Sequence, residues 1–304
     1  MEAPESGFRS ARALIGWIDE AAAAALLGPW GNSLATPANL SRVHSAHAAV
    51  AQRPQSPNPS ANQVVIDLPP ELASHADRLR KRPAAAPYFG EGWSIGLVDL
   101  RYVHALLPTV VTDGGSERIR SASRHEIGSV AAITLPAETE TLTLAPGFNQ
   151  LNNTWTISSD NPNLRVVGQT AGPVPGPVEG TAPGLLMMGF VVAQLPSFMQ
   201  VMLYENRWYL RDGYHRGTSL LRAGHRLVPA FTRRVDRPDE LLIPGGLPLG
   251  VVLSPGPPRL ADYFDDAVST EISVPITRKV VVVQALDLTV LDVNLPKSAG
   301  PPTD

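Results

Sequence analysis

The sequence contains no cysteine, which excludes disulfide bonds, thiol catalysis and zinc sites built on cysteine. Charged residues are also scarce, at 17% of the chain, where globular proteins have about a quarter. The formal net charge is -3, so no general positive charge draws this chain toward DNA or RNA. A local basic patch is still compatible with this balance.

Long apolar runs are missing as well. The run at residues 21–27 follows two acidic residues and lacks the basic segment of a signal peptide. The run Gly184–Leu195 is too short to span a bilayer. We therefore expect a cytoplasmic protein without a membrane segment.

Proline and glycine, in contrast, are abundant, with 30 and 25 residues among 304. This composition predicts many loops and short strands, and the 43% of hydrophobic residues is enough for at least one sizeable core. Helices are expected at Ala11–Leu27 and Thr36–Gln52, with Thr36 as the N-cap before a proline. A linker is expected at Arg53–Gln63, and a short strand followed by a helix from about Pro70.

From Gly92 onward, runs of β-branched residues alternate with turn residues, a pattern that predicts strands. The runs before the second Pro/Gly-rich segment (171–184) are WSIGLVDL, PTVVTD, VAAITL, ETLTLA, NTWTIS and LRVVG. The predicted class is therefore α+β. It comprises a helical N-terminal region with a Pro-rich linker, a β-rich α+β region, an α/β core in the C-terminal half and a disordered tail, at residues 1–62, 63–170, 184–293 and 294–304.

One stretch, RWYLRDGYHRGTSLLRAG (Arg207–Gly224), combines a strand pattern with a helix pattern. Its first half alternates and predicts a strand at Trp208–Asp212, while its second half predicts a helix at Tyr214–Ala223 that stops at Gly224. The turn between them presents a carboxylate, an imidazole and a guanidinium. We call residues 212–218 the corner and expect it to open into a cleft.

The corner has the residue types that an anion site needs. A helix N-terminus offers unpaired N–H groups and partial positive charge. Gly213 permits a tight turn, His215 and Arg216 add donors, and Thr218 adds a hydroxyl. The alternative is a capped turn in which Asp212 accepts backbone N–H bonds and Arg216 pairs with an acidic neighbour. Ser197 and Gln200, just upstream, would face the same cleft or serve as ordinary turn residues.

Residues 198–235 resemble the core of the ParB/sulfiredoxin-like superfamily, over about an eighth of the chain. In that family a strand ends in Gly-x-His-Arg or Gly-x-Arg-Arg, a helix follows, and the next strand often enters through Val-Pro. The matching residues here are Gly213, His215 and Arg216, then Val228-Pro229. The resemblance implies that these glycine, histidine and arginine residues bind phosphate groups.

The match has clear departures. Sulfiredoxin chemistry needs a cysteine, and neither the Gly-Glu-Arg-Arg form nor a following helix-turn-helix of the chromosome-partitioning proteins is present. Asp212 agrees with the Asp-Gly-His-His-Arg pattern that resembles free-serine kinases, but Tyr214 departs from its second-position histidine. These departures concern the chemistry of the motif, whereas the order of strand, turn, helix and strand agrees with the family.

The function predicted from this resemblance is binding of a nucleotide or a small phosphorylated ligand. If the chain is an enzyme, we expect a nucleotide-dependent phosphotransferase or a nucleotide or phosphodiester hydrolase, using a nucleoside triphosphate with Mg²⁺. The alternatives are a non-catalytic binding or assembly protein and a ParB-like nuclease or nucleic-acid binder, with nucleic acid less favoured. The candidate catalytic residues are Asp212 and His215. The candidate binding residues are Gly213, Tyr214, His215, Arg216, Gly217 and Thr218.

Two other pairs have the composition of metal ligands. His44 and His47 lie three apart on an expected helix, but no third ligand is close in sequence, so a solvated helix face is favoured. Asp265 and Asp266 are adjacent carboxylates without a partner segment. No metal site is predicted.

Overall fold

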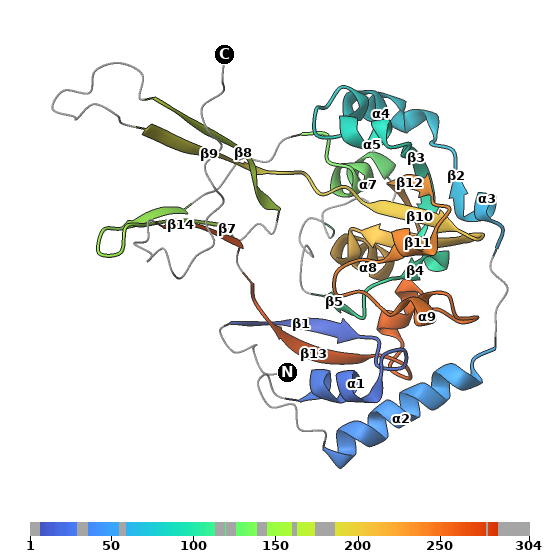
Figure 1. Cartoon of the computed structure of the whole chain (residues 1–304). Helices are drawn as coiled ribbons and strands as arrows, with labels where there is room; N and C mark the ends of the chain where they lie inside the picture. Colours follow the sequence, from blue (N-terminus) through green and yellow to red (C-terminus); the bar gives the residue numbers. More distant parts are fainter. Residues whose placement is uncertain are drawn as a thin grey trace. The chain divides into compact units, whose positions relative to one another are not determined.

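The computed structural model describes residues 7–28, 36–54, 59–112, 119, 126–138, 145–159, 163–173, 186–277 and 279–284. Contacts divide the chain into two units. Unit 1 comprises residues 1–140 and 196–276, and unit 2 comprises residues 141–195 and 277–304. Helices and strands both occur in quantity, in several sheets, which confirms the α+β class (Figure 1). The four regions expected from composition stay a prediction.

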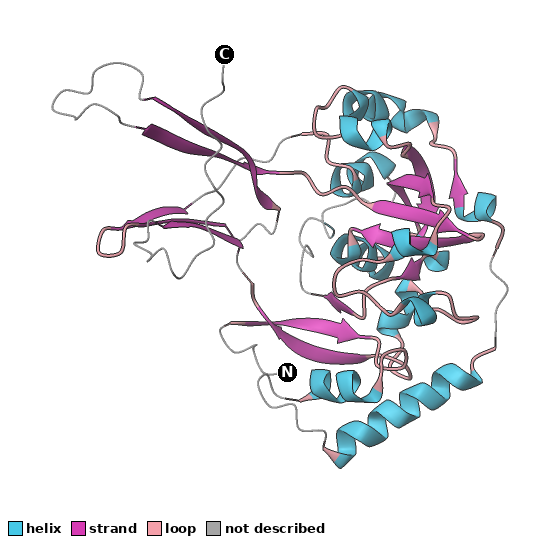
Figure 2. Ribbon diagram, viewed as in Figure 1, coloured by secondary structure: helices cyan, strands magenta, loops and turns pink. Residues whose placement is uncertain are grey.

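The centre of unit 1 is a six-stranded mixed sheet in the order β2-β3-β12-β10-β11-β4 (Figure 2, magenta). Its strands are β2 (Val65–Ile66), β3 (Ser94–Asp99), β4 (His104–Ala105), β10 (Gln200–Tyr204), β11 (Arg207–Asp212) and β12 (Leu227–Arg234). The hairpin β10–β11 turns through Glu205 and Asn206, which have φ of 45° and 66°, as a type I′ turn requires. Helix α8 (Tyr214–Arg222) then connects β11 to β12, which pairs parallel to β10.

Unit 1 also contains helices and short helical turns among its described residues. They are α1 (Glu20–Leu27), α2 (Pro37–Gln52), α3 (Ala61–Val64), α4 (Ala73–Arg80), α5 (Ala86–Gly90), α7 (Ile127–Thr134), α9 (Leu249–Val252) and the 3-10 turns η1 (Pro70–Leu72), η2 (Leu100–Tyr102), η3 (Pro238–Leu241) and η4 (Leu260–Phe264). The Oγ1 atom of Thr36 accepts from the Asn39 amide at 3.2 Å, which confirms this N-cap. The strand and helix expected around Pro70 are β2, η1 and α4. The linker expected at Arg53–Gln63 is interrupted by α3, and residues 55–58 lie outside the described residues.

The helix expected at Ala11–Leu27 is wrong in its first part. Residues Phe8–Ala13 form strand β1, and only Glu20–Leu27 is helical, with Asp19 as its cap. β1 lies at the centre of a three-stranded sheet, between β13 (Thr270–Pro275) and β5 (Thr109–Val111). β13 and β5, which are far away in sequence, pair with the backbone of β1 on both sides. This pairing overrides the helical preference of an alanine-rich stretch.

The strand expected from VAAITL is also wrong, because this run belongs to α7. Val130, Ala131 and Thr134 are buried and lie on one helical face, and the Thr134 hydroxyl donates to the Val130 carbonyl one turn earlier at 3.2 Å. A short β-branched run suits a buried helix face as well as a strand.

Unit 2 contains strands among its described residues, as the sequence predicts. β6 (Ala145–Asn149), β7 (Thr154–Ser159) and β14 (Lys279–Gln284) form one sheet, and β8 (Leu164–Pro173) pairs with β9 (Leu186–Gln194). The rings of Phe148 and Trp155 stack at 4.4 Å on an exposed face. Most of the second Pro/Gly-rich segment, and the tail expected to be disordered, lie outside the described residues. Among the described helices, none has the length and apolar character needed to cross a membrane.

Candidate functional site

The strand and helix predicted on either side of the corner are confirmed as β11 and α8. Gly213 lies between them with φ of 95°, in the left-handed region. A Cβ atom there would lie 3.2 Å from backbone and side-chain atoms of Met199, closer than ordinary van der Waals contact. Glycine is therefore needed both for the backbone conformation and for the close approach of Met199.

The charged side chains of the corner bond to the protein itself. Asp212 accepts from the Gly213 amide through Oδ1 at 2.6 Å and from the Ser197 hydroxyl through Oδ2 at 3.1 Å. Arg216 donates through Nη1 to the carbonyls of Ser197 and Ile133 at 2.6 and 3.1 Å, and through Nη2 to Ser197 Oγ at 2.8 Å. This network matches much of the capped-turn alternative, although Arg216 donates here to carbonyl and hydroxyl oxygens and not to a carboxylate.

Other candidate binding residues pack inside the fold. Tyr214 is buried, and its hydroxyl donates to the Leu210 carbonyl and accepts from the Leu106 amide at 2.6 Å. Burial is the main reason that the pKa of this phenol is raised. Thr218 is also buried and donates to the Tyr214 carbonyl at 2.8 Å, while a Cβ at Gly217 would meet Met199 at 3.4 Å. Ligand contacts by Tyr214, Gly217 and Thr218 stay a prediction.

His215 is different because its side chain is exposed. Its Nδ1 lies 3.1 Å from the Val111 carbonyl, an acceptor, so Nδ1 carries the proton of this bond. Nε2 is then an acceptor in the neutral ring and a donor in the protonated ring. Gly213, the N-cap of α8, contributes no side-chain cap. The exposed imidazole at an uncapped helix start is the part of the corner that suits a ligand.

Sequence reasoning did not find Tyr88, whose phenol lies close to the corner. Its pKa is raised mainly by burial and also by the negative charge of Asp212. Ser197 and Gln200 were both expected near the corner. Ser197 bonds to Asp212 of the corner, whereas Gln200 donates to the Tyr88 hydroxyl at 3.2 Å. No motif in the sequence connects residue 88 with residue 212.

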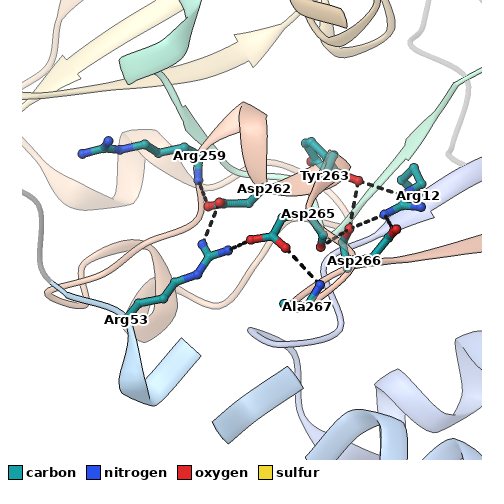
Figure 3. A network of polar contacts seen from close by, with 9 residues as sticks. Arg12, Arg53, Arg259, Asp262, Tyr263, Asp265, Asp266 and Ala267 are labelled. Atoms are coloured by element: carbon teal, nitrogen blue, oxygen red, sulfur yellow. Dashed lines mark hydrogen bonds and ion pairs between the residues drawn. The ribbon is translucent and has the colours of Figure 1, made fainter. Parts of the chain in front are cut away.

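A second candidate site is a pocket of about 920 Å³ in unit 1, lined by described residues that include none from 212–218. Its walls come from the loop after β1, the C-terminal end of α2, β4, and the segment from α9 to η4. Arg53 donates from Nη1 to Asp262 at 2.6 Å and from Nη2 to Asp265 (Figure 3). Asp262 also accepts from the Arg259 amide at 2.7 Å.

His104 lines the same pocket and is 2% exposed. Its Nδ1 lies 3.3 Å from the Pro257 carbonyl, whereas its Nε2 is buried and has no hydrogen-bond partner among the described residues. Burial, together with the positive charges of Arg259 and Arg207, lowers the pKa of His104 to about 4, although the carbonyls of Pro257 and Pro258 act in the opposite direction.

The metal-ligand pairs considered from the sequence have protein partners. His44 lies 3.0 Å from Glu20, and His47 Nε2 lies 2.9 Å from the Ile18 carbonyl. Asp265 pairs with Arg53, and Asp266 pairs with an arginine on β1, Arg12, at 2.5 Å (Figure 3). Within the described part of the chain, no group of three or more histidine, aspartate or glutamate side chains is placed to hold a metal ion.

Comparison with known proteins adds no relative: no family model, no curated protein and no solved structure matches the chain. The resemblance of residues 198–235 to the ParB/sulfiredoxin-like superfamily therefore stays a prediction.

Proposed function

We propose that this chain binds a phosphate-bearing small molecule, most simply a nucleotide, at the N-terminus of α8. One observation carries the proposal. Helix α8 begins at a left-handed glycine without a side-chain cap, and His215 in its first turn is exposed. A nucleotide ligand agrees with the cytoplasmic location expected from the sequence.

Electrostatics favours an anion at this place. The aligned peptide dipoles leave partial positive charge at a helix N-terminus, and phosphate oxygens accept hydrogen bonds from first-turn amides. In α1 and α2 a side-chain oxygen, from Asp19 and Thr36 respectively, accepts a hydrogen bond from a first-turn amide. α8 has no such side chain at Gly213, so a phosphate oxygen would take its place, next to the exposed imidazole of His215.

The contacts favour binding over catalysis. Both carboxylate oxygens of Asp212 accept hydrogen bonds from the protein, and these bonds hold the side chain against the turn. Arg216 is anchored on Ser197 and Ile133, so in this proposal it positions the turn. The described residues include no group of three or more acidic or histidine side chains placed to hold a metal ion, and the expected nucleoside triphosphate with Mg²⁺ stays a prediction. The catalytic roles of Asp212 and His215 stay predictions.

Nucleic acid is the less favoured partner on contacts as well as on charge. Arginines near the corner bond to the protein: Arg207 to the Ser254 carbonyl, Arg211 to the Glu240 carbonyl, and Arg233 to the Glu240 carboxylate. Arginines that bond to the protein in this way bind the phosphate groups of a nucleic acid more weakly than arginines that face the solvent. The proposal therefore commits to a small ligand.

Isothermal titration calorimetry with ATP, GTP and pyrophosphate tests the proposal. We expect at least one of them to bind the wild type and to bind His215→Ala about tenfold more weakly, because a hydrogen bond to a charged group is worth about 1.5–3 kcal/mol. His44→Ala, which removes an exposed histidine on α2, is the matched control and should bind as the wild type does. Equal affinity in His215→Ala, or no binding by the wild type, would reject the site.

A further inference from the structure

The pocket lined by His104 is independent of α8, and its size lies within the range of about 300–1,000 Å³ usual for small-molecule sites. Its walls are mixed. Trp17, Val50 and Val251 supply apolar surface, while Arg53 and Asp262 supply a planar guanidinium and a carboxylate. Such a pocket suits a ligand that has both apolar faces and polar edges.

The chemistry of His104 narrows the choice of ligand. The Pro257 carbonyl can only accept, so the proton of the ring is on Nδ1, and Nε2 presents a lone pair. Among the described residues, Nε2 of His104 is a buried acceptor without a donor. Such an atom destabilises the folded state, and native proteins rarely contain one without a reason. A ligand that brings a hydrogen-bond donor to Nε2 would remove this deficit.

The surrounding charges favour a neutral donor over a cationic one. Arg259 and Arg207 lie close enough to His104 to disfavour its protonation, and they would repel an ammonium group there in the same way. Arg53 pairs with both Asp262 and Asp265, so this group keeps one net negative charge, which disfavours an anionic ligand at this wall. Hydroxyl groups can bond to such paired side chains without separating them.

We propose that this pocket binds a neutral polyhydroxylated ligand of the sugar or polyol class. One hydroxyl donates to His104 Nε2, neighbouring hydroxyls bond to the Arg53–Asp262 pair, and the C–H faces of the ligand pack on Trp17 and Val251. Because none of residues 212–218 lines the pocket, failure of this proposal would leave the phosphate site untouched.

Calorimetric titration of the full chain with D-glucose, D-ribose, sucrose and myo-inositol tests the proposal. We expect at least one probe to bind the wild type at millimolar concentrations. His104→Phe, which keeps a flat ring and removes the acceptor, should bind that probe about tenfold more weakly. His104→Gln, which retains an acceptor, should recover part of the loss. The control His44→Phe makes the same change at an exposed histidine and should leave affinity unchanged.

A second measurement on the wild type covers the case in which the His104 variants do not fold. The ¹⁵N resonance of His104 Nε2 should shift toward that of a hydrogen-bonded nitrogen when the sugar that binds is added. Three results would overturn the proposal: no probe binds, His104→Phe binds as the wild type does, or the Nε2 resonance does not respond. An ordered water on Nε2, together with no binding of any probe, would identify water as the missing partner and would also overturn it.

Discussion

His104 illustrates how a single residue links burial to pH. The folded chain lowers the pKa of this imidazole from 6.5 to about 4, mainly through burial. Between these two values the unfolded chain binds a proton that the folded chain does not. The free energy of unfolding therefore falls as the pH falls through this range, and above it the full contribution of His104 is present.

We predict a loss of about 3 kcal/mol from this group between pH 7 and pH 4, as an order of magnitude, because one pKa unit corresponds to about 1.4 kcal/mol. Urea unfolding at several pH values would measure it. In His104→Phe the pH dependence should become flatter by this amount, while other titrating groups keep theirs. A variant whose stability falls as steeply as that of the wild type would show that His104 is not held neutral.

Residue types, but not their partners, could be predicted from the sequence. Arg216 has the chemistry of a phosphate ligand, and its position after a glycine at a helix start pointed to that role. Arg216 donates, however, to the carbonyls of Ser197 and Ile133, and residue 133 belongs to a run for which a strand was expected. For that reason Arg216→Lys is a poor probe of ligand binding, since it would also disturb the turn.

Secondary-structure elements with strong local signals were predicted correctly. The alternation in β11, the glycine stop after α8 and the Thr36 cap of α2 each have a local physical cause, and each is present. β1 and α7 failed because their state depends on distant partners. Alanine-rich and short β-branched segments have weak intrinsic preferences, and tertiary contacts decide between helix and strand.

The junction between β11 and α8 gives a prediction at this scale. Gly213→Ala should be destabilising by two separate effects, the left-handed φ of 95° and the 3.2 Å approach to Met199. Gly92→Ala is the matched control, because Gly92 has φ of 83° and open space around the added methyl. We expect Gly92→Ala to cost about 1 kcal/mol and Gly213→Ala at least about 1 kcal/mol more, from urea unfolding. Equal costs would mean that Met199 moves aside freely.

At the scale of the whole molecule, the main apolar core belongs to unit 1, as do both candidate sites. The corner was found from the sequence because its residues are consecutive. The pocket was not, because its walls come from residues 16–19, 47–54, 104 and 250–265, which only the fold brings together. Unit 2 carries exposed apolar side chains on its strands, including Phe148, Trp155 and Val282.

The claim that phosphate binds at the start of α8 is tested most directly by an NMR titration of the ¹⁵N-labelled full chain with ATP and pyrophosphate. Amide resonances report on every part of the chain at once, so the corner, the pocket and unit 2 are compared in one experiment. We predict that the largest shift changes fall on the amides of Tyr214, His215 and Arg216, in the first turn of α8. Saturating shifts centred on any other segment, or no shifts at these three amides, would contradict the proposed function.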